Sequence, residues 1–490
     1  MNITEYLDLA AEKFPDKIAL SDKSRAFDYR TLLNRVNSVS AFLFEKIGTG
    51  KSVLVGISRS VESVVLFLGV AKSGNFFVPV DFSLPAGRIT QMKETVSPSA
   101  CLLANERAKV PFSDIPVYPG TEAMSFECDG FEAVGGGNDP LYCIFTSGST
   151  GIPKGVLKSH KSVEIMTECF SREFGFDSER IFGNQCPFDF DVSYKDIFST
   201  IRNGAELHIL EKTLFSFPTM LTERLNERKI NTLLWSVSAM KIASSLGAFS
   251  EGAPKYLKQV MFSGEVMPTG VLSDWRKNCP DAEFVNLYGP TEIAYNCTFY
   301  RVKGEYTGAL PAGKAFDGTE VFLFDKGEIT SPGITGEIYI KSPGLAMGYY
   351  KDSEKTAASF PNDPRTGEGR VYKTGDNGAW NENGELVFKG RKDWQIKHMG
   401  HRIELSEVET AACNLGYLGS LCCIFDKERD VICLFHEGAE DKKAEISKDL
   451  RRVLPSYMIP TDIRAVKEMP KTRTGKIDRN AVAREYLQAE

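Results

Sequence analysis

The first 300 residues alternate short apolar runs with amphipathic segments. Apolar positions at helical spacing predict helices over residues 4–14, 29–44, 61–73 and 158–174, with Thr4 as the N-cap of the first. Continuous apolar runs predict buried strands over residues 52–57, 75–80, 100–104, 141–145 and 230–236, and at the start of 260–265 and 284–292. Strands alternating with helices at this spacing are typical of a doubly wound α/β sheet.

The pattern changes after about residue 310. Short strands are predicted over residues 320–324, 337–341, 371–373 and 386–389, with hairpin turns at 325–327 and 381–384, which indicates a small β-rich subdomain. The last hundred residues predict helices over 406–415 and 444–453 and strands over 420–425 and 431–436. Such a segment is large enough for an α+β domain with its own core. We therefore expect a domain of residues 1–392 and a second domain of residues 393–490.

Composition narrows the class of protein. The chain has 490 residues, 42% of them hydrophobic, with a net charge of −6, which disfavours a nucleic-acid surface as its main site. The N-terminus lacks the pattern of a signal peptide, and no apolar run approaches the roughly 20 residues of a membrane helix. Eleven cysteines without a C-x-x-C pair indicate reduced thiols and a cytoplasmic protein. The five histidines show no metal-ligand spacing, and His160 is expected to pack or cap rather than catalyse.

A loop rich in hydroxyls and glycines follows the predicted strand at 141–145. It runs Thr146-Ser-Gly-Ser-Thr-Gly-Ile-Pro-Lys154-Gly, and its backbone N–H groups, hydroxyls and lysine could hold phosphate oxygens. It is not a Walker A loop, because Lys154 is followed by glycine. A flexible turn between a strand and a helix is the alternative.

The order Thr-Ser-Gly-Ser-Thr-Gly-x-Pro-Lys-Gly resembles the nucleotide loop of the adenylate-forming superfamily: acyl-CoA synthetases, luciferases and the adenylation domains of peptide synthetases. The resemblance implies that the loop wraps the β- and γ-phosphates of ATP. The residues it assigns to this role are Thr146, Ser147, Gly148, Ser149, Thr150, Gly151 and Lys154.

Two further segments resemble ATP-binding motifs of this superfamily. In Asn286-Leu-Tyr-Gly-Pro-Thr-Glu292, the resemblance implies adenine contacts from Asn286, Tyr288, Gly289 and Thr291 and a Mg²⁺ ligand in Glu292. In Tyr372-Lys-Thr-Gly-Asp376 it implies a ribose-binding carboxylate, with Arg391 as a cation for the ribose or the α-phosphate. The alternatives are a plain turn for the first and a β-turn with a surface salt bridge for the second.

The segment from Pro470 to Arg479 is basic and contains Gly475. By itself it predicts a solvated basic tail. The resemblance implies that Lys476 is the catalytic lysine, which bridges the acyl carboxylate and the α-phosphate in the transition state. Arg479 is expected to be solvated or to face pyrophosphate.

The segment Phe190-Asp191-x-Ser193 indicates which class of carboxylic acid the enzyme would activate. In the amino-acid-activating branch an aspartate here pairs with the substrate ammonium, and a buried carboxylate needs such a partner. Asp189 is a neighbouring candidate, and Asp191 is preferred because Ser193 and Asp196 then fall in register with the resemblance. A helix cap is the alternative role for Asp191. The pocket positions of that branch fall on Asp191, Val192, Lys195, Leu234, Met261, Ser263, Leu287, Tyr295 and Asn296. Lys195, one helical turn after Asp191, could bind a side-chain carboxylate, pair with Asp191 or face solvent.

The segments around Trp235 and Met261 are similar to stand-alone D-alanine–D-alanyl carrier protein ligases. Those enzymes usually have cysteine where this chain has Ser263, so D-alanine is in question, and alanine, serine or an acidic residue all stay open. No carrier domain follows Lys476, so we expect the phosphopantetheine on a separate carrier protein. The resemblance implies that the C-terminal domain turns about Asp393 and that Gly400 lines the pantetheine tunnel.

The predicted function is thus ATP-dependent, AMP-forming ligation of an amino acid to a carrier protein, by a protein expected to be monomeric. An acyl- or aryl-CoA synthetase of the same fold is the alternative enzyme. A binding scaffold without catalysis is the non-enzymatic alternative. The carrier and the pathway are not defined by the sequence.

Overall fold

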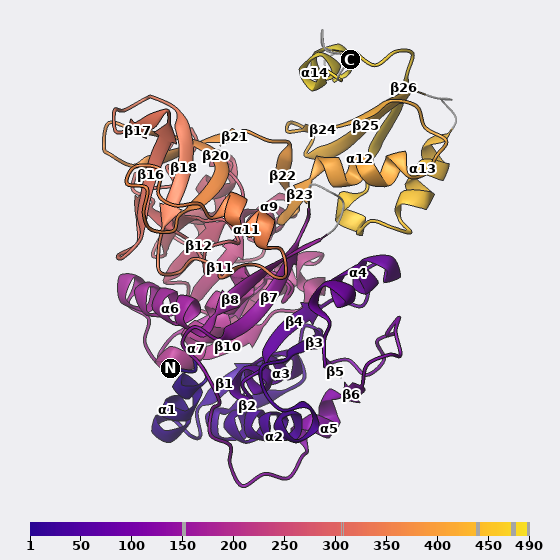
Figure 1. Cartoon of the computed structure of the whole chain (residues 1–490). Coiled ribbons are helices and arrows are strands. Elements are labelled where there is room, and N and C mark those ends of the chain that lie inside the picture. Colours follow the sequence, from indigo (N-terminus) through magenta and orange to yellow (C-terminus); the bar gives the residue numbers. More distant parts are fainter. Residues whose placement is uncertain (149–152, 305, 307, 438–441, 472–476, 488–490) are drawn as a thin grey trace. The chain divides into compact units, whose positions relative to one another are not determined.

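The structure is a computed structural model that describes residues 1–148, 153–304, 306, 308–437, 442–471 and 477–487. Its contacts divide the chain into two compact units (Figure 1). The first comprises Met1–Asp81, Val96–Ile144 and Gly155–Lys392, and the second comprises Phe82–Thr95, Phe145–Lys154 and Asp393–Glu490. The second unit thus includes two short segments that the sequence assigned to the N-terminal domain, and the division into residues 1–392 and 393–490 stays a prediction.

Seven strands form one sheet, in the order β19-β8-β7-β4-β3-β5-β6. Their bounds are β3 (Ser52–Gly56), β4 (Phe76–Val80), β5 (Ala100–Leu103), β6 (Val117–Pro119), β7 (Pro140–Thr146), β8 (Lys154–Ser159) and β19 (Gly348–Tyr349). The pairs β3–β4, β3–β5, β4–β7 and β5–β6 are parallel. Strands β3, β4 and β5 are buried along their whole length, which is why they are continuous apolar runs in the sequence.

Nine strands form a second sheet, in the order β15-β14-β13-β12-β11-β9-β10-β1-β2. Their bounds are β1 (Ile18–Ser21), β2 (Ala26–Asp28), β9 (Ile181–Asn184), β10 (Glu206–Ile209), β11 (Thr232–Ser236), β12 (Gln259–Ser263), β13 (Glu283–Tyr288), β14 (Thr298–Arg301) and β15 (Lys314–Ala315). Strands β9 to β13 and β1 pair in parallel, and antiparallel strands close both edges.

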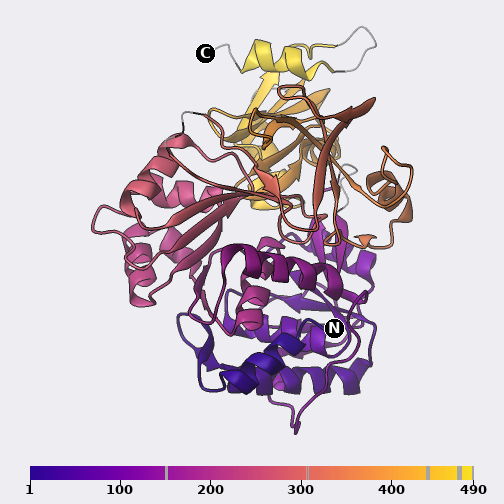
Figure 2. The ribbon, with the colours of Figure 1, turned by 90° about the vertical axis from the view of Figure 1, so that its left-hand side faces the viewer.

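Helices pack on these two sheets. Their bounds are α1 (Glu5–Lys13), α2 (Tyr29–Ile47), α3 (Val61–Lys72), α5 (Gly120–Met124), α6 (His160–Phe174), α7 (Val192–Asn203), α8 (Pro218–Glu227), α9 (Val237–Ser245), α10 (Thr269–Asn278) and, later, α11 (Ser353–Ser359), with a 3-10 turn at η1 (Lys212–Phe215). Helices α1, α2 and α3 lie side by side (Figures 1 and 2). Because α3 lies on β3 and β4 and α7 on β9 to β11, the ring of Phe67 meets that of Tyr194 at 5.7 Å, and one apolar core joins both sheets.

An antiparallel five-stranded sheet completes the first unit, in the order β17-β16-β18-β20-β21. Its strands are β16 (Glu320–Asp325), β17 (Gly327–Ile329), β18 (Gly336–Lys341), β20 (Tyr372–Trp380) and β21 (Leu386–Arg391). Both hairpins predicted from turn residues are present, since β16 pairs with β17 and β20 with β21. The predicted strand at 371–373 is the start of a longer one, β20, which is broken by a bulge between Asn377 and Gly378.

The second unit has an α+β core. Its elements are α4 (Ala86–Val96), β22 (Gln395–His398), β23 (His401–Glu404), α12 (Leu405–Cys413), β24 (Leu421–Asp426), β25 (Val431–Glu437), α13 (Lys443–Leu450), η3 (Ser456–Met458), β26 (Asp462–Val466) and α14 (Arg479–Tyr486). Strands β24, β25 and β26 form a sheet, and α12 and α14 pack on β24. Among the residues described above, no helix has the length and apolar character needed to cross a bilayer.

Of two predictions about helix starts, the N-cap of α1 is confirmed in position and the start of α6 is wrong. Thr4 is at the N-cap position of α1, but its side chain makes no capping hydrogen bond. The helix predicted from residue 158 begins at His160, because Lys158 and Ser159 complete β8, whose pairing partner β19 is far away in sequence. Ser159 caps α6 instead, accepting the N–H of Ser162 at 3.1 Å. His160 is buried, and its Nδ1 accepts the N–H of Ile3 at 3.2 Å, as expected of a packing residue.

Candidate active site

The predicted specificity residues on strands lie in the middle of β11 and β12 or near the carboxyl ends of β12 and β13. Leu234 pairs with Met261, and Ser263 pairs with Leu287, so the four residues occupy neighbouring positions on three parallel strands. All four are buried. In open α/β sheets ligands bind outside this end of the strands.

Helix α7 and the segment after β13 carry the other predicted specificity residues. Lys195 Nζ donates to Asn296 Oδ1 at 2.8 Å, which connects the helix to this segment. Tyr295 adopts a left-handed backbone with φ of 65°, and its hydroxyl bonds with Thr167 Oγ1 at 2.7 Å. Val192 is the first residue of α7 and is half-buried.

Lys195 was the ambiguous member of this set. It is 1% exposed, so the alternative that it faces solvent is wrong. Its Nζ lies 5.9 Å from the centroid of the Phe170 ring. Burial lowers the pKa of Lys195, and the negative charges of Asp196 and Asp191 oppose that shift, the former more strongly. Lys195 is therefore a buried cation with a neutral partner, Asn296, and a carboxylate on the adjacent residue.

Asp191 precedes α7 at the N-cap position, yet its side chain makes no capping bond, so the helix-cap alternative is wrong. Its carboxylate is buried and forms no ion pair with any residue within the described ranges. Burial raises the pKa of Asp191 to about 6, while the positive charges of Lys158 and Lys195 lower it. The group is thus a buried carboxylate without a direct cationic partner.

Lys158 was missed by the sequence reasoning, which assigned it to a helix. It is fully buried in β8. Burial lowers the pKa of Lys158 to about 7, and the carboxylates of Asp191 and Glu292 act in the opposite direction. One feature of the sequence could have indicated its burial: Lys158 directly follows two apolar residues, Val156 and Leu157, which come after the predicted loop.

The predicted ribose and adenine residues form a connected cluster on the first unit. Asp376 Oδ2 accepts from the Tyr288 hydroxyl at 2.5 Å, and Oδ1 accepts from Arg391, which also donates to the carbonyl of Thr374 at 3.2 Å. Asp376 and Arg391 are directly opposite on β20 and β21. Because Asp376 is buried within a strand, the alternative of a surface turn is wrong.

Two more residues of the predicted adenine loop have contacts within the protein. Asn286 Nδ2 donates to the carbonyl of Pro311 at 2.8 Å, which fixes the orientation of its amide. Gly289 packs so tightly that an added Cβ would come within 2.7 Å of Asn296 Cα, so no side chain fits there. Thr291 follows in the same turn and is half-buried.

Glu292, the predicted metal ligand, is fully buried and accepts the Tyr349 hydroxyl at 2.8 Å through Oε1. Within the described residues no group of three His, Cys, Asp or Glu side chains could hold a metal ion. Mg²⁺ is commonly held by one or two carboxylates together with water and substrate phosphates. Glu292 therefore fits a metal that arrives with a nucleotide, rather than a metal site formed by protein alone.

The described part of the predicted phosphate loop contacts the C-terminal segment of the second unit. Ser147 Oγ donates to the carbonyl of Arg402 at 2.6 Å and accepts the N–H of Glu404 at 3.1 Å. The N–H of Gly148 donates to Glu407 Oε2 at 3.2 Å.

Other parts of the loop are less connected. Thr146 Oγ1 is buried without a hydrogen-bond partner in the part of the chain that the structure describes, and Lys154 is the first residue of β8. Ser149, Thr150 and Gly151, and the catalytic candidate Lys476, lie outside the described residues.

The two residues predicted for the hinge and the tunnel belong to the second unit. Asp393 is its first residue after Lys392, and Asp393 Oδ1 accepts the N–H of Gln395 at 3.3 Å. Gly400 lies in the turn between β22 and β23 with φ of 81°, a backbone conformation that favours glycine.

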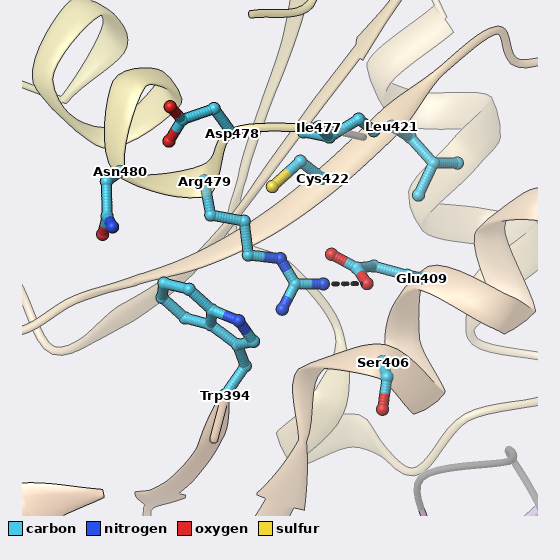
Figure 3. Close-up of a pocket in the computed structure, with 9 residues that line it drawn as sticks. All are labelled: Trp394, Ser406, Glu409, Leu421, Cys422, Ile477, Asp478, Arg479 and Asn480. Carbon is cyan, nitrogen blue, oxygen red and sulfur yellow. Dashed lines mark hydrogen bonds and ion pairs between the residues drawn. The ribbon is translucent and has the colours of Figure 1, made fainter. Parts of the chain in front are cut away.

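A hollow of about 580 Å³ lies on the second unit (Figure 3). Its lining residues are Trp394, Ser406, Glu409, Leu421, Cys422, Ile477, Asp478, Arg479 and Asn480. Arg479 forms an ion pair with Glu409 and lies 5.0 Å from the Trp394 ring, so the expectation that it is solvated is wrong. None of the residues predicted from the sequence as site residues lines this hollow.

Comparisons with known proteins define the class. Residues 7–350 match the family described as AMP-binding enzyme, and residues 407–476 match the AMP-binding enzyme C-terminal domain. The fold and these matches define an ATP-dependent, AMP-forming ligase. The chain belongs to the AMP-binding enzymes, and the predicted superfamily, fold and enzyme class are confirmed.

Individual relatives refine the picture. The D-alanine–D-alanyl carrier protein ligase of Bacillus licheniformis is 31% identical over an alignment of 512 positions, which covers 99% of this chain and 99% of that protein. Gramicidin S synthase 2 of Brevibacillus brevis is also 31% identical, over 98% of this chain but 11% of its own length. A solved NRPS protein containing adenylation and PCP domains has a TM-score of 0.87 at 25% identity, over 99% of this chain and 84% of its own. The predicted likeness to amino-acid-activating ligases is therefore confirmed.

Proposed function

We propose that this protein joins an amino acid to AMP and then transfers it to the phosphopantetheine thiol of a carrier protein. The observation that carries the proposal is Asp191, a buried carboxylate at the carboxyl end of the nine-stranded sheet with no ion-pair partner among the described residues. A substrate ammonium would supply the missing charge. The end-to-end likeness to a D-alanine–D-alanyl carrier protein ligase supports the same conclusion.

In the first step a carboxylate oxygen of the amino acid bonds to the α-phosphorus of ATP. The bond from that phosphorus to the bridging oxygen breaks, and pyrophosphate leaves with the electron pair, so no proton transfer is required. The protein's task is to hold two anions together and to stabilise charge on the leaving group. We assign the purine face to Tyr288, its amino edge to Asn286, the ribose hydroxyls to Asp376 and the α-phosphate or ribose to Arg391.

Magnesium is part of the proposal. Glu292 would supply one carboxylate oxygen, with nucleotide phosphates and water as the remaining ligands. When bound, Mg²⁺ neutralises phosphate charge. Glu292 itself is fixed by the hydroxyl of Tyr349, which holds its Oε1 in place.

In the second step the thiol sulfur of the carrier's phosphopantetheine bonds to the carbonyl carbon of the aminoacyl-AMP. The carbon–oxygen bond to AMP breaks, AMP leaves with the electron pair, and the thiol proton passes to solvent. We propose that Asp393 is the hinge about which the C-terminal unit turns between the steps, and that Gly400 leaves room for the pantetheine arm. Lys476 is the proposed catalytic lysine of the first step.

The test is amino-acid-dependent exchange of labelled pyrophosphate into ATP, over D- and L-amino acids, fatty acids and aryl acids. Exchange with an amino acid supports the proposal, and it should be lost with Lys476→Ala. Exchange with acids that lack an amino group alone would favour an acyl- or aryl-CoA synthetase. The acceptor is then tested by offering phosphopantetheinylated carrier protein or coenzyme A to the loaded enzyme. Transfer to coenzyme A alone would contradict the carrier part of the proposal.

A further inference from the structure

Lys158 is a buried cation without a partner. It is one of the largest fully buried side chains of the protein, and its Nζ makes no hydrogen bond to any residue in the described part of the chain. An unpaired ammonium in the interior is costly, because burial removes its hydration without replacing it. Such a group persists where a ligand completes it.

The surroundings of Lys158 belong to the amino-acid pocket. The two carboxylates that act on its charge are those of Asp191 and Glu292. On the adjacent strand β7, the Tyr142 hydroxyl is likewise buried and has no hydrogen-bond partner among the described residues. The negative charge of Asp191 acts on Tyr142 as well. Two buried donors without acceptors therefore lie near the proposed ammonium site.

The charges of the pocket can be matched one by one. In the proposed function Asp191 pairs with the substrate ammonium and Glu292 with a metal. Lys195 has Asn296 as its hydrogen-bond acceptor and Asp196 as the carboxylate that acts on it most strongly. Of Lys195 and Lys158, Lys158 is the one left unmatched. An amino acid brings one carboxylate to it, and the second oxygen of that carboxylate stays available to the proposed catalytic lysine, Lys476.

Position favours the same match. The reacting carboxylate of an amino acid is two bonds from the ammonium and must reach the α-phosphate of the metal-bound nucleotide. Lys158 lies on β8 beside β7, and the ring of Tyr142 on β7 is 4.6 Å from that of Tyr194 on α7, the helix that directly follows Asp191. This placement suits Lys158 to that intermediate position. A side-chain carboxylate would have no unmatched cation left, because Lys195 is already satisfied within the protein.

We infer that Lys158 binds the reacting carboxylate of the substrate, with the Tyr142 hydroxyl beside it, and that the substrate is an amino acid with an uncharged side chain. This inference rests on the proposed function. Lys158 donates a hydrogen bond to the carboxylate oxygen that does not attack, and the step involves no proton transfer from it. It thereby orients the attacking oxygen toward the α-phosphorus.

The experiment compares Lys158→Met with the wild-type enzyme in pyrophosphate exchange and in thermal unfolding. Removing an unpaired buried charge should raise the unfolding temperature of the ligand-free protein. The KM for the amino acid should rise about 10- to 100-fold, as expected for a hydrogen bond to a charged group. The inhibition constant of the matching amino alcohol, which lacks the carboxylate, should not change. Lys158→Gln provides a second variant of similar length.

Lys72→Met is the matched control. Lys72 is also buried, but it has a partner, Asp8 Oδ1 at 2.5 Å. Its replacement should lower the unfolding temperature and leave the KM unchanged. A KM for the amino acid that is unchanged in both Lys158 variants would overturn the carboxylate assignment.

The wild-type panel tests the substrate class separately. Alanine, serine, valine and phenylalanine are compared with aspartate and glutamate, each as both enantiomers. Preference for an uncharged side chain is expected, and preference for aspartate or glutamate would overturn that part of the inference. Absence of exchange with every amino acid would instead overturn the proposed function and this inference together.

Discussion

The proposed nucleotide cluster and the proposed amino-acid pocket differ in how their buried polar groups are satisfied. On the five-stranded sheet, Asp376 is satisfied by Tyr288 and Arg391 before any ligand arrives. In the proposed amino-acid pocket, Asp191, directly before α7, has no ion pair, and Lys158, on β8 of the seven-stranded sheet, has no hydrogen bond among the described residues. In the first region the polar groups are paired within the protein before a ligand binds. In the second region the ligand would supply the missing partners.

In the proposed function, this difference indicates which of the two regions would define substrate specificity. A preorganised cluster positions a ligand common to many enzymes, and its geometry changes little on binding. A ligand that leaves buried charges unsatisfied binds with a less favourable free energy. Such charges therefore discriminate between ligands more strongly than a preorganised cluster does. Changes in the cluster should therefore affect ATP, and changes in the pocket should affect the amino acid.

The largest effect is expected for Asp376→Ala. The change leaves the Arg391 guanidinium unpaired and removes the proposed ribose acceptor, so kcat/KM for ATP should fall about 1000-fold, or about 4 kcal/mol. The KM for the amino acid should stay within a factor of about three. Pyrophosphate exchange with each substrate varied in turn measures both values. Equal losses for the two substrates would show that the cluster and the pocket are not separable.

Asp191→Asn should have the next largest effect, and on the other substrate. Loss of the ammonium partner should lower kcat/KM for the amino acid about 100-fold, with the KM for ATP unchanged. The folded-state pKa of about 6 lies above the unfolded value, so the charge opposes folding once the pH exceeds both. The variant should therefore be more stable than wild type at pH 8, by up to about 3 kcal/mol, and lose that advantage below about pH 4. Urea unfolding at both pH values tests this, and a less stable variant at pH 8 would contradict it.

His160 is a buried group that already has a hydrogen-bond partner, the N–H of Ile3, so its replacement serves as a comparison. Burial lowers the pKa of His160 to about 4, so the unfolded chain takes up a proton between about pH 6.5 and pH 4 that the folded protein does not. Stability should fall through this range by at most about 3 kcal/mol on account of His160. Urea unfolding of His160→Asn should show a shallower pH dependence, with exchange kinetics like those of wild type. A changed KM for either substrate would argue that His160 is more than a packing residue.

Tyr288→Phe should have the smallest effect. It keeps the aromatic face and removes the hydroxyl that donates to Asp376. Since Arg391 still holds that carboxylate, the KM for ATP should rise only about fivefold, or about 1 kcal/mol. Replacement by leucine, which lacks the ring as well, should cost more if the purine packs there. An equal effect of both variants would contradict the assigned purine face.

Much of the fold could be predicted from the sequence, because buried parallel strands are continuous apolar runs. The strands at 52–57, 75–80 and 100–104 were expected within one residue of β3, β4 and β5. The start of α6 was not, since Lys158 and Ser159 belong to β8, which lies between β7 and β19, the latter nearly 200 residues later in the chain. Local periodicity carries no information on such a partner.

The candidate site was predictable to the extent that motifs mark it. Asp376 and Arg391 were assigned from two separate segments and prove to be opposite each other on paired strands. Lys158 was missed because a lysine in a presumed helix is normally solvated, and only the strand and its burial make the charge unusual. The bond from Ser147 to Arg402 spans 255 residues and has no local signal.

The contacts of Ser147 and Gly148 have a consequence for the order of the steps in the proposed reaction. The hydroxyl and the N–H that the loop would offer to a phosphate are the same groups that bind the Arg402 carbonyl and the Glu407 carboxylate. One donor hydrogen cannot serve both partners at full strength. Binding of a polyphosphate to Ser147 and Gly148 and binding of the 402–407 segment to the same groups are therefore mutually exclusive. Departure of pyrophosphate would then be the event that lets this segment dock, which sets the order of events without a separate sensor.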